Sequence, residues 1–161
     1  MRIGVISDTH GRLDSRVAGL FAGVDHIVHG GDVGSLEVLA ELEHMAPLTA
    51  VVGNTDGGEV AARLPRVATG VVEVGGGEAP LRFAAAHKKQ WLLDEIADPA
   101  AAGFDLVVYG HTHEPALRWR DGVLWVNPGT VTAPEPDDRR RTVAVVERQG
   151  DVLNGRVVFL D

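Results

Sequence analysis

The chain of 161 residues contains no cysteine. It therefore has neither disulfide bonds nor thiolate metal ligands, and every zinc-finger type of site is excluded. A chain without disulfides suits a reducing compartment, so we expect a cytoplasmic protein.

Long apolar runs are also missing, since every run is far shorter than the ~20 residues that a helix needs to cross a bilayer. Residues 2–6 already read as a strand, with no positively charged leader and apolar stretch before them. We therefore expect no secretion signal and no membrane partner.

Positive charge is scarce. The chain has 15 Lys and Arg residues against 23 Asp and Glu residues, which gives a formal net charge of -8. Binding to long nucleic acids depends on counterion release by Lys and Arg, so we expect no such partner, and any phosphate must be attracted by local charge. The length predicts a single domain over residues 1–161, whereas the oligomeric state stays open.

The chain predicts a mixed α/β domain. In its first third, short apolar runs alternate with amphipathic segments, the pattern of a βαβαβ unit with parallel strands. The expected strands are Ile3–Ile6, His26–His29 and Leu48–Val52, and the expected helices are Asp14–Phe21, capped by Asp14 or Ser15, and Leu36–Met45, capped by Ser35.

The rest of the chain is richer in strands. Asp121-Gly122 is a strong hairpin signal, and Gln149-Gly150-Asp151 separates a second pair of strands. The expected strands are Val67–Val74, Leu81–Ala86, Leu106–Tyr109, Leu117–Arg120, Val123–Val126, Val143–Glu147 and Val152–Phe159, with a helix from Trp91 toward Ala102.

Polar side chains capable of binding metal follow several of these strands. The carboxyl ends of parallel strands meet at one edge of a sheet, so the side chains can converge there. In extended backbone, residues two apart point the same way, which lets each Asp-x-His or His-x-His pair face one point. Imidazole and carboxylate together favour Zn, Mn, Fe or Ni, and seven groups are enough for two ions. They are Asp8, His10, Asp32, Asn54, His87, His111 and His113.

The order Asp-x-His, Gly-Asp, Gly-Asn, His, Gly-His-x-His resembles the calcineurin-like metallophosphoesterases, in particular their small bacterial and archaeal phosphodiesterases. The resemblance runs from Met1 to about Thr130 and is carried by five segments together. They are Ser7-Asp8-Thr9-His10-Gly11, Gly30-Gly31-Asp32, Gly53-Asn54-Thr55-Asp56, Gly110-His111-Thr112-His113 and Asn127-Pro128-Gly129-Thr130.

The resemblance implies a four-layer αββα sandwich and a dinuclear metal site. Asp8, His10, Asp32 and His113 would hold the first ion, and Asp32, Asn54, His87 and His111 the second, so that Asp32 bridges the ions. A hydroxide between the ions would attack phosphorus, and no protein nucleophile is needed. Manganese is the ion we expect, with nickel, iron or zinc as alternatives.

Each ligand also has a structural interpretation. Asp8 could cap the following helix, Gly53-Asn54 could be a plain turn, and the glycine-rich segment at Asp32 could be a dinucleotide loop. His87 is the least certain ligand, because Lys88-Lys89 follows it where the family often has Gly-His. The other histidines, His26, His29 and His44, are expected to be structural or solvent-facing.

Substrate contacts are predicted from position alone. Arg12 lies close to His10 in sequence and is a candidate for a bidentate phosphate contact, together with Asn54. Lys88 and Lys89 are weaker candidates of the same kind, and Trp91 is a candidate wall of the pocket.

One family feature is missing. Larger relatives have a histidine directly after the Asn of Gly-Asn, thought to protonate the leaving oxygen, whereas this chain has Thr55. The leading prediction is phosphodiester hydrolysis of a small substrate. The alternatives are a phosphomonoesterase or nucleotide phosphatase on the same site, and a non-catalytic scaffold with the same fold, as in a retromer subunit.

Overall fold

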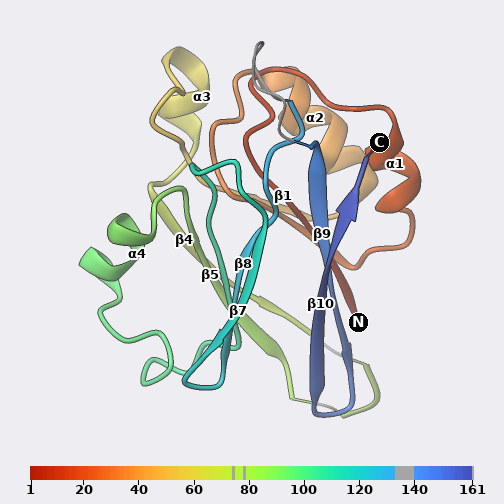
Figure 1. The fold of residues 1–161 in the computed structure, drawn as a ribbon, viewed down its shortest axis with the longest axis vertical. Helices are drawn as coiled ribbons and strands as arrows, with labels where there is room; N and C mark the ends of the chain where they lie inside the picture. The colour runs from red at the N-terminus through yellow and green to blue at the C-terminus, as the bar shows by residue number, and fades with distance from the viewer. Residues whose placement is uncertain (74, 78, 133–139, 161) are drawn as a thin grey trace.

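Two five-stranded β-sheets face each other in the computed structural model, which describes residues 1–73, 75–77, 79–132 and 140–160 (Figure 1). The first sheet has the order β10-β9-β1-β2-β3, and the second has the order β4-β5-β6-β8-β7. The strands of the first sheet are β1 (Arg2–Ile6), β2 (His26–His29), β3 (Leu48–Ala50), β9 (Thr142–Gln149) and β10 (Val152–Phe159). Those of the second are β4 (Val67–Val72), β5 (Leu81–Ala86), β6 (Leu106–Val108), β7 (Ala116–Arg120) and β8 (Val123–Asn127).

Each sheet contains a parallel set of three strands. In the first sheet β1, β2 and β3 run parallel, and β9 runs antiparallel to both β1 and β10. In the second, β5, β6 and β8 run parallel, with β4 and β7 antiparallel at the edges. The carboxyl ends of a parallel set open on a single edge, which is where such sheets bind ligands.

Helices cover both outer faces. They are α1 (Arg16–Leu20), α2 (Leu36–Met45), α3 (Gly58–Arg63) and α4 (Lys89–Glu95), and a short 3₁₀ turn, η1, spans Gly75–Gly77. None of the helices in the described ranges is long and apolar enough to cross a membrane.

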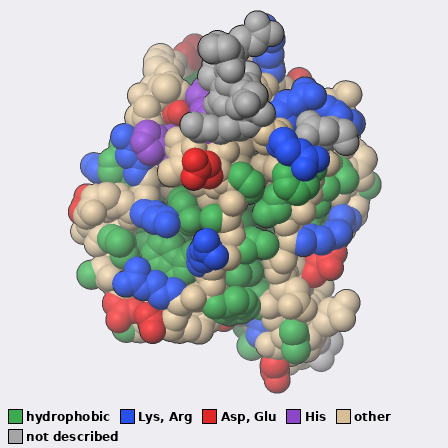
Figure 2. Space-filling view, in the orientation of Figure 1, with side chains coloured by type: hydrophobic (Ala, Val, Ile, Leu, Met, Phe, Trp, Pro, Cys, Tyr) green, Lys and Arg blue, Asp and Glu red, His purple; other side chains and the backbone are tan. Residues whose placement is uncertain are grey.

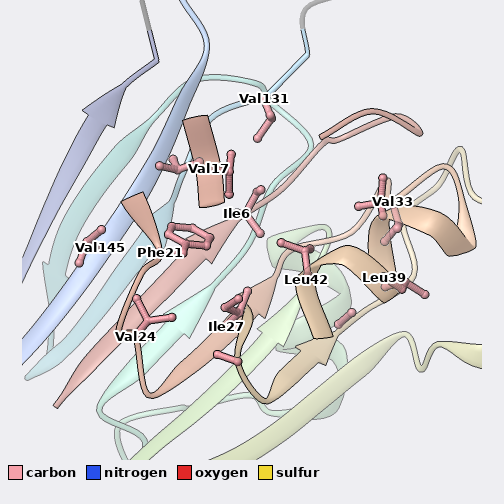
Figure 3. Packing of buried hydrophobic residues seen from close by; sticks show 14 of the residues in the cluster. Ile6, Val17, Phe21, Val24, Ile27, Val33, Leu39, Leu42, Val131 and Val145 are labelled. Atoms are coloured by element: carbon pink, nitrogen blue, oxygen red, sulfur yellow. The ribbon is translucent and has the colours of Figure 1, made fainter. Parts of the chain in front are cut away.

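The buried hydrophobic residues form three clusters, one at each boundary between layers. The first packs α1 and α2 on the outer face of the first sheet through side chains such as Phe21, Ile27 and Leu42 (Figure 3). The second lies between the sheets and includes Val5 and Phe83, and the third packs α4 on the second sheet through Leu92. Three such boundaries make the four-layer αββα sandwich that the family resemblance implies.

Alternation along β1 shows how the sequence builds two of these boundaries. Ile3 and Val5 point into the space between the sheets, whereas Ile6 points toward the helices. Gly4 also faces the helices, and a Cβ there would come within 2.9 Å of the Phe21 ring. The missing side chain lets α1 pack directly on the strand.

The βαβαβ unit predicted for the first third is confirmed, as are both hairpins. Ser35 caps α2 by accepting a hydrogen bond from the Val38 backbone N–H at 3.4 Å. At α1 the Asp14 carboxylate accepts from the Arg16 N–H at 3.0 Å, whereas Ser15 makes no side-chain cap. Asp121 and Gly122 have φ values of 51° and 80°, as a type I′ hairpin turn requires.

The predicted helix from Trp91 toward Ala102 is wrong at both ends. The helix begins at Lys89 and ends at Glu95. Pro99 disfavours helical backbone at Asp98, so residues 99–103 form turns instead, closed by a hydrogen bond from the Ala102 N–H to the Asp98 carbonyl at 3.0 Å.

Other differences are smaller. The sequence does not predict helix α3. Two glycines stand at its start, and Val60 is the one residue that it buries, so its amphipathic pattern is too short to recognise. Helix α1 is shorter than expected, and β3, β4 and β6 end one or two residues earlier than expected. Val74, the predicted end of the β4 strand, lies outside the described residues.

Candidate metal centre

All seven predicted ligands lie on loops that directly follow parallel strands. Asp8 and His10 follow β1, Asp32 follows β2 and Asn54 follows β3, all in the first sheet, whereas His87 follows β5 and both His111 and His113 follow β6 in the second. The two sheets therefore bring their loops to one edge of the sandwich, near the top of Figure 1. In Figure 2, histidine side chains are exposed in this part of the surface.

Three of these residues form a first group of ligand atoms around one Asp8 oxygen. Asp8 Oδ1 lies 3.0 Å from His113 Nε2 and 3.9 Å from His10 Nε2. The two histidine nitrogens are 3.4 Å apart. Asp8 is fully buried and the histidines are partly exposed, so an ion held here would have one side open to solvent.

A second group consists of Asp8, Asp32 and His87, all buried. His87 Nε2 lies 3.3 Å from Asp32 Oδ2 and 4.0 Å from Asp8 Oδ1. Asp8 belongs to both groups and Asp32 to the second only. The assignment of Asp32 as the bridging ligand stays a prediction.

Two atoms of these ligand groups, Asp8 Oδ1 and His87 Nε2, are buried and make no hydrogen bond among the described residues. His113 Nε2 lies 3.0 Å from the first and Asp32 Oδ2 3.3 Å from the second, but neither contact has the geometry of a hydrogen bond. The other polar atom of each side chain is bound, because Asp8 Oδ2 accepts from the Ser7 hydroxyl at 2.5 Å, and His87 Nδ1 lies 2.8 Å from the Gly30 carbonyl. In the neutral ring, that carbonyl fixes the proton on Nδ1 and leaves a lone pair on Nε2, the form that binds a metal ion. A metal ion would satisfy both orphaned atoms, so the site fits the ions that the sequence predicts.

The remaining two predicted ligands lie nearby. The His111 ring is 5.3 Å from the His87 ring between centroids, and the His111 N–H donates to Asp8 Oδ2 at 3.2 Å. Asn54 is exposed and lies between Gly53, which packs against Asp32, and Thr55, whose N–H donates to Asp32 Oδ1 at 2.9 Å. The backbone of Asn54 thus lies beside Asp32, whereas ligation by the Asn54 side chain stays a prediction.

The backbone at these ligands is left-handed, not extended as expected. Positive φ values of 45–73° occur at five of the seven predicted ligands, Asp8, His10, Asp32, His111 and His113. The only other described residue of this kind, glycine apart, is Asp121 in the hairpin turn. Asp8, His10 and His113 still come together, and His111 lies beside His87. Left-handed turns of the backbone place them there, not the geometry of an extended strand.

Close backbone packing joins the loops. A Cβ at Gly110 would collide with Ser7 Oγ and come within 2.5 Å of Asp8 Oδ2. A Cβ at Gly31 would come within 2.7 Å of the His87 side chain. These positions accept only glycine, because the loops of the two sheets lie in direct contact.

Charge at the centre is predominantly negative. Burial by itself would raise the pKa of the Asp32 carboxyl, but the His87 ring and the Thr55 N–H hold that pKa well below its usual range. Burial opposes protonation of His87 as well, yet Asp32 and Asp8 raise its pKa above the ordinary value. Burial and the positive charge of Lys88 lower the pKa of His111. The Asp32 carboxylate is thus ionised at neutral pH, as metal ligation requires.

Residues outside the ligand set hold the loops. Asp56 Oδ2 accepts from the Gly53 N–H at 2.8 Å, and its Oδ1 accepts from the Gly34 N–H at 2.8 Å. Asn127 donates to the Gly110 carbonyl at 3.1 Å and so holds the loop that carries His111 and His113. His29, expected to be structural or solvent-facing, is fully buried and bonded to Thr9, a role that the Gly-Gly-Asp segment after it does not reveal.

The model of the calcineurin-like phosphoesterase superfamily domain matches residues 1–151. The chain belongs to this superfamily. A relative named probable metallophosphoesterase from Methanothermobacter thermautotrophicus is 33% identical over 167 aligned positions, which cover 98% of this chain and 92% of that protein. Among solved structures, one described as a novel archaeal phosphodiesterase superposes with a TM-score of 0.70 at 27% identity, covering 98% of this chain and all of that one.

The phosphoesterase fold also occurs in proteins with other names. The structure of Vps29 from Entamoeba histolytica in complex with zinc has a TM-score of 0.67 at 18% identity, and both chains are covered completely. At that identity the likeness is evidence for a common fold alone. The family match and the relatives named for phosphoester chemistry make this chain a metal-dependent phosphoesterase.

Proposed function

We propose that the protein hydrolyses phosphodiesters of small molecules at a pair of divalent transition-metal ions, with manganese as the preferred metal. The first ion is held by Asp8, His10, Asp32 and His113. The second is held by Asp32, Asn54, His87 and His111. The observation that carries the proposal is the pair of orphaned buried atoms, Asp8 Oδ1 and His87 Nε2, which lie 4.0 Å apart. Asp8 belongs to both ligand groups, and His87 belongs to the second.

When bound, the ions supply positive charge for the phosphate and lower the pKa of water so that it can attack phosphorus. The residues of the chain set the positions. The Gly30 carbonyl orients His87, and the Thr55 N–H holds Asp32. Ser7, the hydroxyl nearest to Asp8, is buried and donates to that carboxylate, so it does not act as a nucleophile.

Arg12 and Asn54 are the proposed substrate contacts. Both are exposed, and each lies within two residues of a group that packs at the centre. Arg12 can form two hydrogen bonds to one phosphate group, which suits the outer oxygens of a bound diester. Asn54 combines ligation of the second ion with contact to the same phosphate.

The test is metal content combined with turnover. After reconstitution with excess Mn, we expect two ions per chain by elemental analysis and hydrolysis of bis-p-nitrophenyl phosphate well above that of p-nitrophenyl phosphate. Loss of an outer-shell partner already costs ~10–100-fold, so His87→Ala and His113→Ala should each lower diester turnover by at least ~100-fold.

His44→Ala is the control, because His44 is exposed and lies 2.6 Å from the Ala40 carbonyl on α2. It should leave turnover unchanged. Faster hydrolysis of the monoester than of the diester would contradict the proposal and identify the protein as a phosphomonoesterase. Metal binding without turnover of either ester would indicate a scaffold.

A further inference from the structure

A cluster of cations surrounds the start of α4, although the chain as a whole is acidic. The guanidinium of Arg66 lies 4.6 Å from the centre of the Trp91 ring, and Lys88 Nζ lies 5.4 Å from the same centre. Lys89 Nζ lies 4.4 Å from the ring of Tyr109. We call these residues, Arg66, Lys88, Lys89 and Trp91, the α4 cation cluster.

The charges of this cluster are at most weakly paired with carboxylates of the described residues. Among the described residues, no carboxylate lies within ion-pair distance of Lys88 or Lys89. Arg66 reaches Asp94 at 3.9 Å, but both side chains are about half exposed, and such a pair contributes little. Asp94 also accepts a hydrogen bond from Gln90 at 2.7 Å. Arg66 can therefore turn toward a ligand at small cost.

The cluster borders the metal centre on the side of His87. Lys88 directly follows that residue, and the Trp91 ring lies 6.3 Å from the His87 ring between centroids. Tyr109, below Lys89, is two residues before His111. In Figure 2, histidine side chains lie beside Lys or Arg side chains at the upper left of the face.

The Trp91 indole holds cations instead of offering a free surface for a base. Two like charges on one ring repel each other, and the electron-rich face of the indole offsets part of that repulsion. Two cations that share one ring, and are not strongly paired with carboxylates, suit an anion with more than one negative oxygen. Ions at the metal centre would hold the phosphate that is cleaved, which leaves the cluster for a different anionic group of the same molecule.

We propose that the α4 cation cluster binds a second phosphate group of the substrate, so that the preferred substrates are phosphodiesters that carry an additional phosphate close to the scissile one. This inference rests on the proposed diester hydrolysis. Terminally phosphorylated dinucleotides have the required chemistry. The scissile phosphate lies at His87, and Arg66 and Lys88 receive the second phosphate.

The test compares the dinucleotide TpT with its 5′-phosphorylated and 3′-phosphorylated forms, using the Mn-reconstituted protein. We expect kcat/KM for one phosphorylated form to exceed that for TpT by about tenfold, the effect of one charge-assisted hydrogen bond. Arg66→Gln and Lys88→Gln should reduce this ratio to about twofold or less by raising KM for the phosphorylated form. A merely structural role would not change the ratio between two substrates.

Arg82→Gln is the matched control, because Arg82 also lies over an aromatic ring, that of Phe104 at 5.2 Å, but at the opposite end of β5. It should keep the wild-type ratio. A ratio near one for both phosphorylated forms in the wild type would overturn the inference, as would a ratio that survives both cluster substitutions.

A binding measurement separates this inference from the proposed activity. By calorimetry, thymidine 3′,5′-bisphosphate should bind the Mn-loaded protein about tenfold more tightly than thymidine 5′-monophosphate, and Arg66→Gln should remove the difference. If no dinucleotide is cleaved and this difference is still found, the cluster is confirmed and the diesterase activity is wrong. Equal binding of the two nucleotides would overturn the cluster.

Discussion

The proposed ligands have an uncommon backbone conformation. Left-handed φ values at non-glycine residues cost about 1–3 kcal/mol each when the surroundings must enforce them, although Asp and His adopt them more readily than most residues. Here five of the seven proposed ligands have such φ values, and they lie on loops at one edge of the sandwich. Strain of this kind persists where function requires a side chain in a fixed direction. The loops therefore orient their ligands before any ion binds.

Single substitutions test which carboxylate bridges the two ions. Asp32→Asn should abolish most binding of both ions, because the predicted bridge is lost. Asp8→Asn should remove the first ion and leave the second. Elemental analysis and the spin coupling between two Mn ions by electron paramagnetic resonance measure both.

The opposite result has a definite meaning. If Asp8→Asn lost both ions and Asp32→Asn lost one, Asp8 would be the bridge. The structure allows this outcome, because the Asp8 carboxylate belongs to both ligand groups.

Thr55 predicts a dependence on the leaving group. Its hydroxyl is a poor acid near neutral pH, so the departing oxygen leaves with its charge. We expect a nitrophenyl diester to react far faster than an alkyl diester. Thr55→His should narrow that gap, since an imidazole of ordinary pKa can donate a proton.

Rates across a series of leaving groups, for both proteins, provide the measurement. A flat series for the native enzyme would show that another group donates the proton. His10 and His113, the partly exposed ligands, are then the first candidates.

At the scale of elements, His29 connects the loops that follow β1 and β2. The Gly31 N–H donates to its Nδ1 at 3.1 Å, so Nε2 carries the proton and donates to the Thr9 hydroxyl at 2.9 Å. That hydroxyl in turn donates to the Val33 carbonyl at 2.9 Å. Since Thr9 lies between Asp8 and His10, and Gly31 precedes Asp32, the neutral ring ties together the backbones of three proposed ligands.

Burial makes this connection dependent on pH. It lowers the pKa of His29 from 6.5 to about 4. The unfolded chain therefore takes up a proton between these values that the folded protein does not, and the free energy of unfolding falls as the pH drops from about 7 to about 4. A tenfold change in proton affinity corresponds to about 1.4 kcal/mol, so the loss is on the order of 3 kcal/mol.

Urea unfolding of the chelator-treated protein at several pH values measures this loss. His29→Gln should be less stable at pH 7.5 but should lack this part of the pH dependence, whereas His44→Gln should retain it. An unchanged pH dependence in His29→Gln would show that other groups carry it.

At the scale of the whole molecule, the candidate metal centre lies between loops of the two sheets. Asp8, His10 and Asp32 come from loops of the first sheet, and His87, His111 and His113 come from loops of the second. Besides the hydrophobic cluster between the sheets, the ions would be a second link between them. The same ions would offset the repulsion between the buried carboxylates.

Removal of metal should therefore destabilise the fold. An ion present at about 100 times its Kd contributes about 2.7 kcal/mol if it binds only the folded state. For a chain of this size that corresponds to a rise in Tm of about 5–10 °C, measured by calorimetry with Mn against chelator. Asp32→Asn should lose most of this shift and His44→Ala none. Binding of Mn without any rise in Tm would mean that the ions do not link the sheets.

The sequence by itself determined the order of strands and helices in the first third and the identity of the candidate ligands. Both depend on local physics. Apolar runs of four or five residues specify buried strands. Turns need glycine at positions where the backbone of another loop leaves no room for a Cβ. The prediction that α4 continues toward Ala102 is wrong, because Pro99 has no N–H to donate to the Glu95 carbonyl and ends the helix there.

Only the tertiary structure decided which atoms meet. The left-handed turns at the ligands, the burial of His29 and the meeting of Arg66 with Trp91 depend on contacts between segments far apart in the chain. No local pattern encodes them, because the space open to a side chain is set by the neighbours that the other sheet supplies. Asp8 illustrates both contributions. The sequence indicates that it is a ligand, and the tertiary structure directs Ser7 and the His111 N–H to its Oδ2 and leaves its Oδ1 without a hydrogen bond.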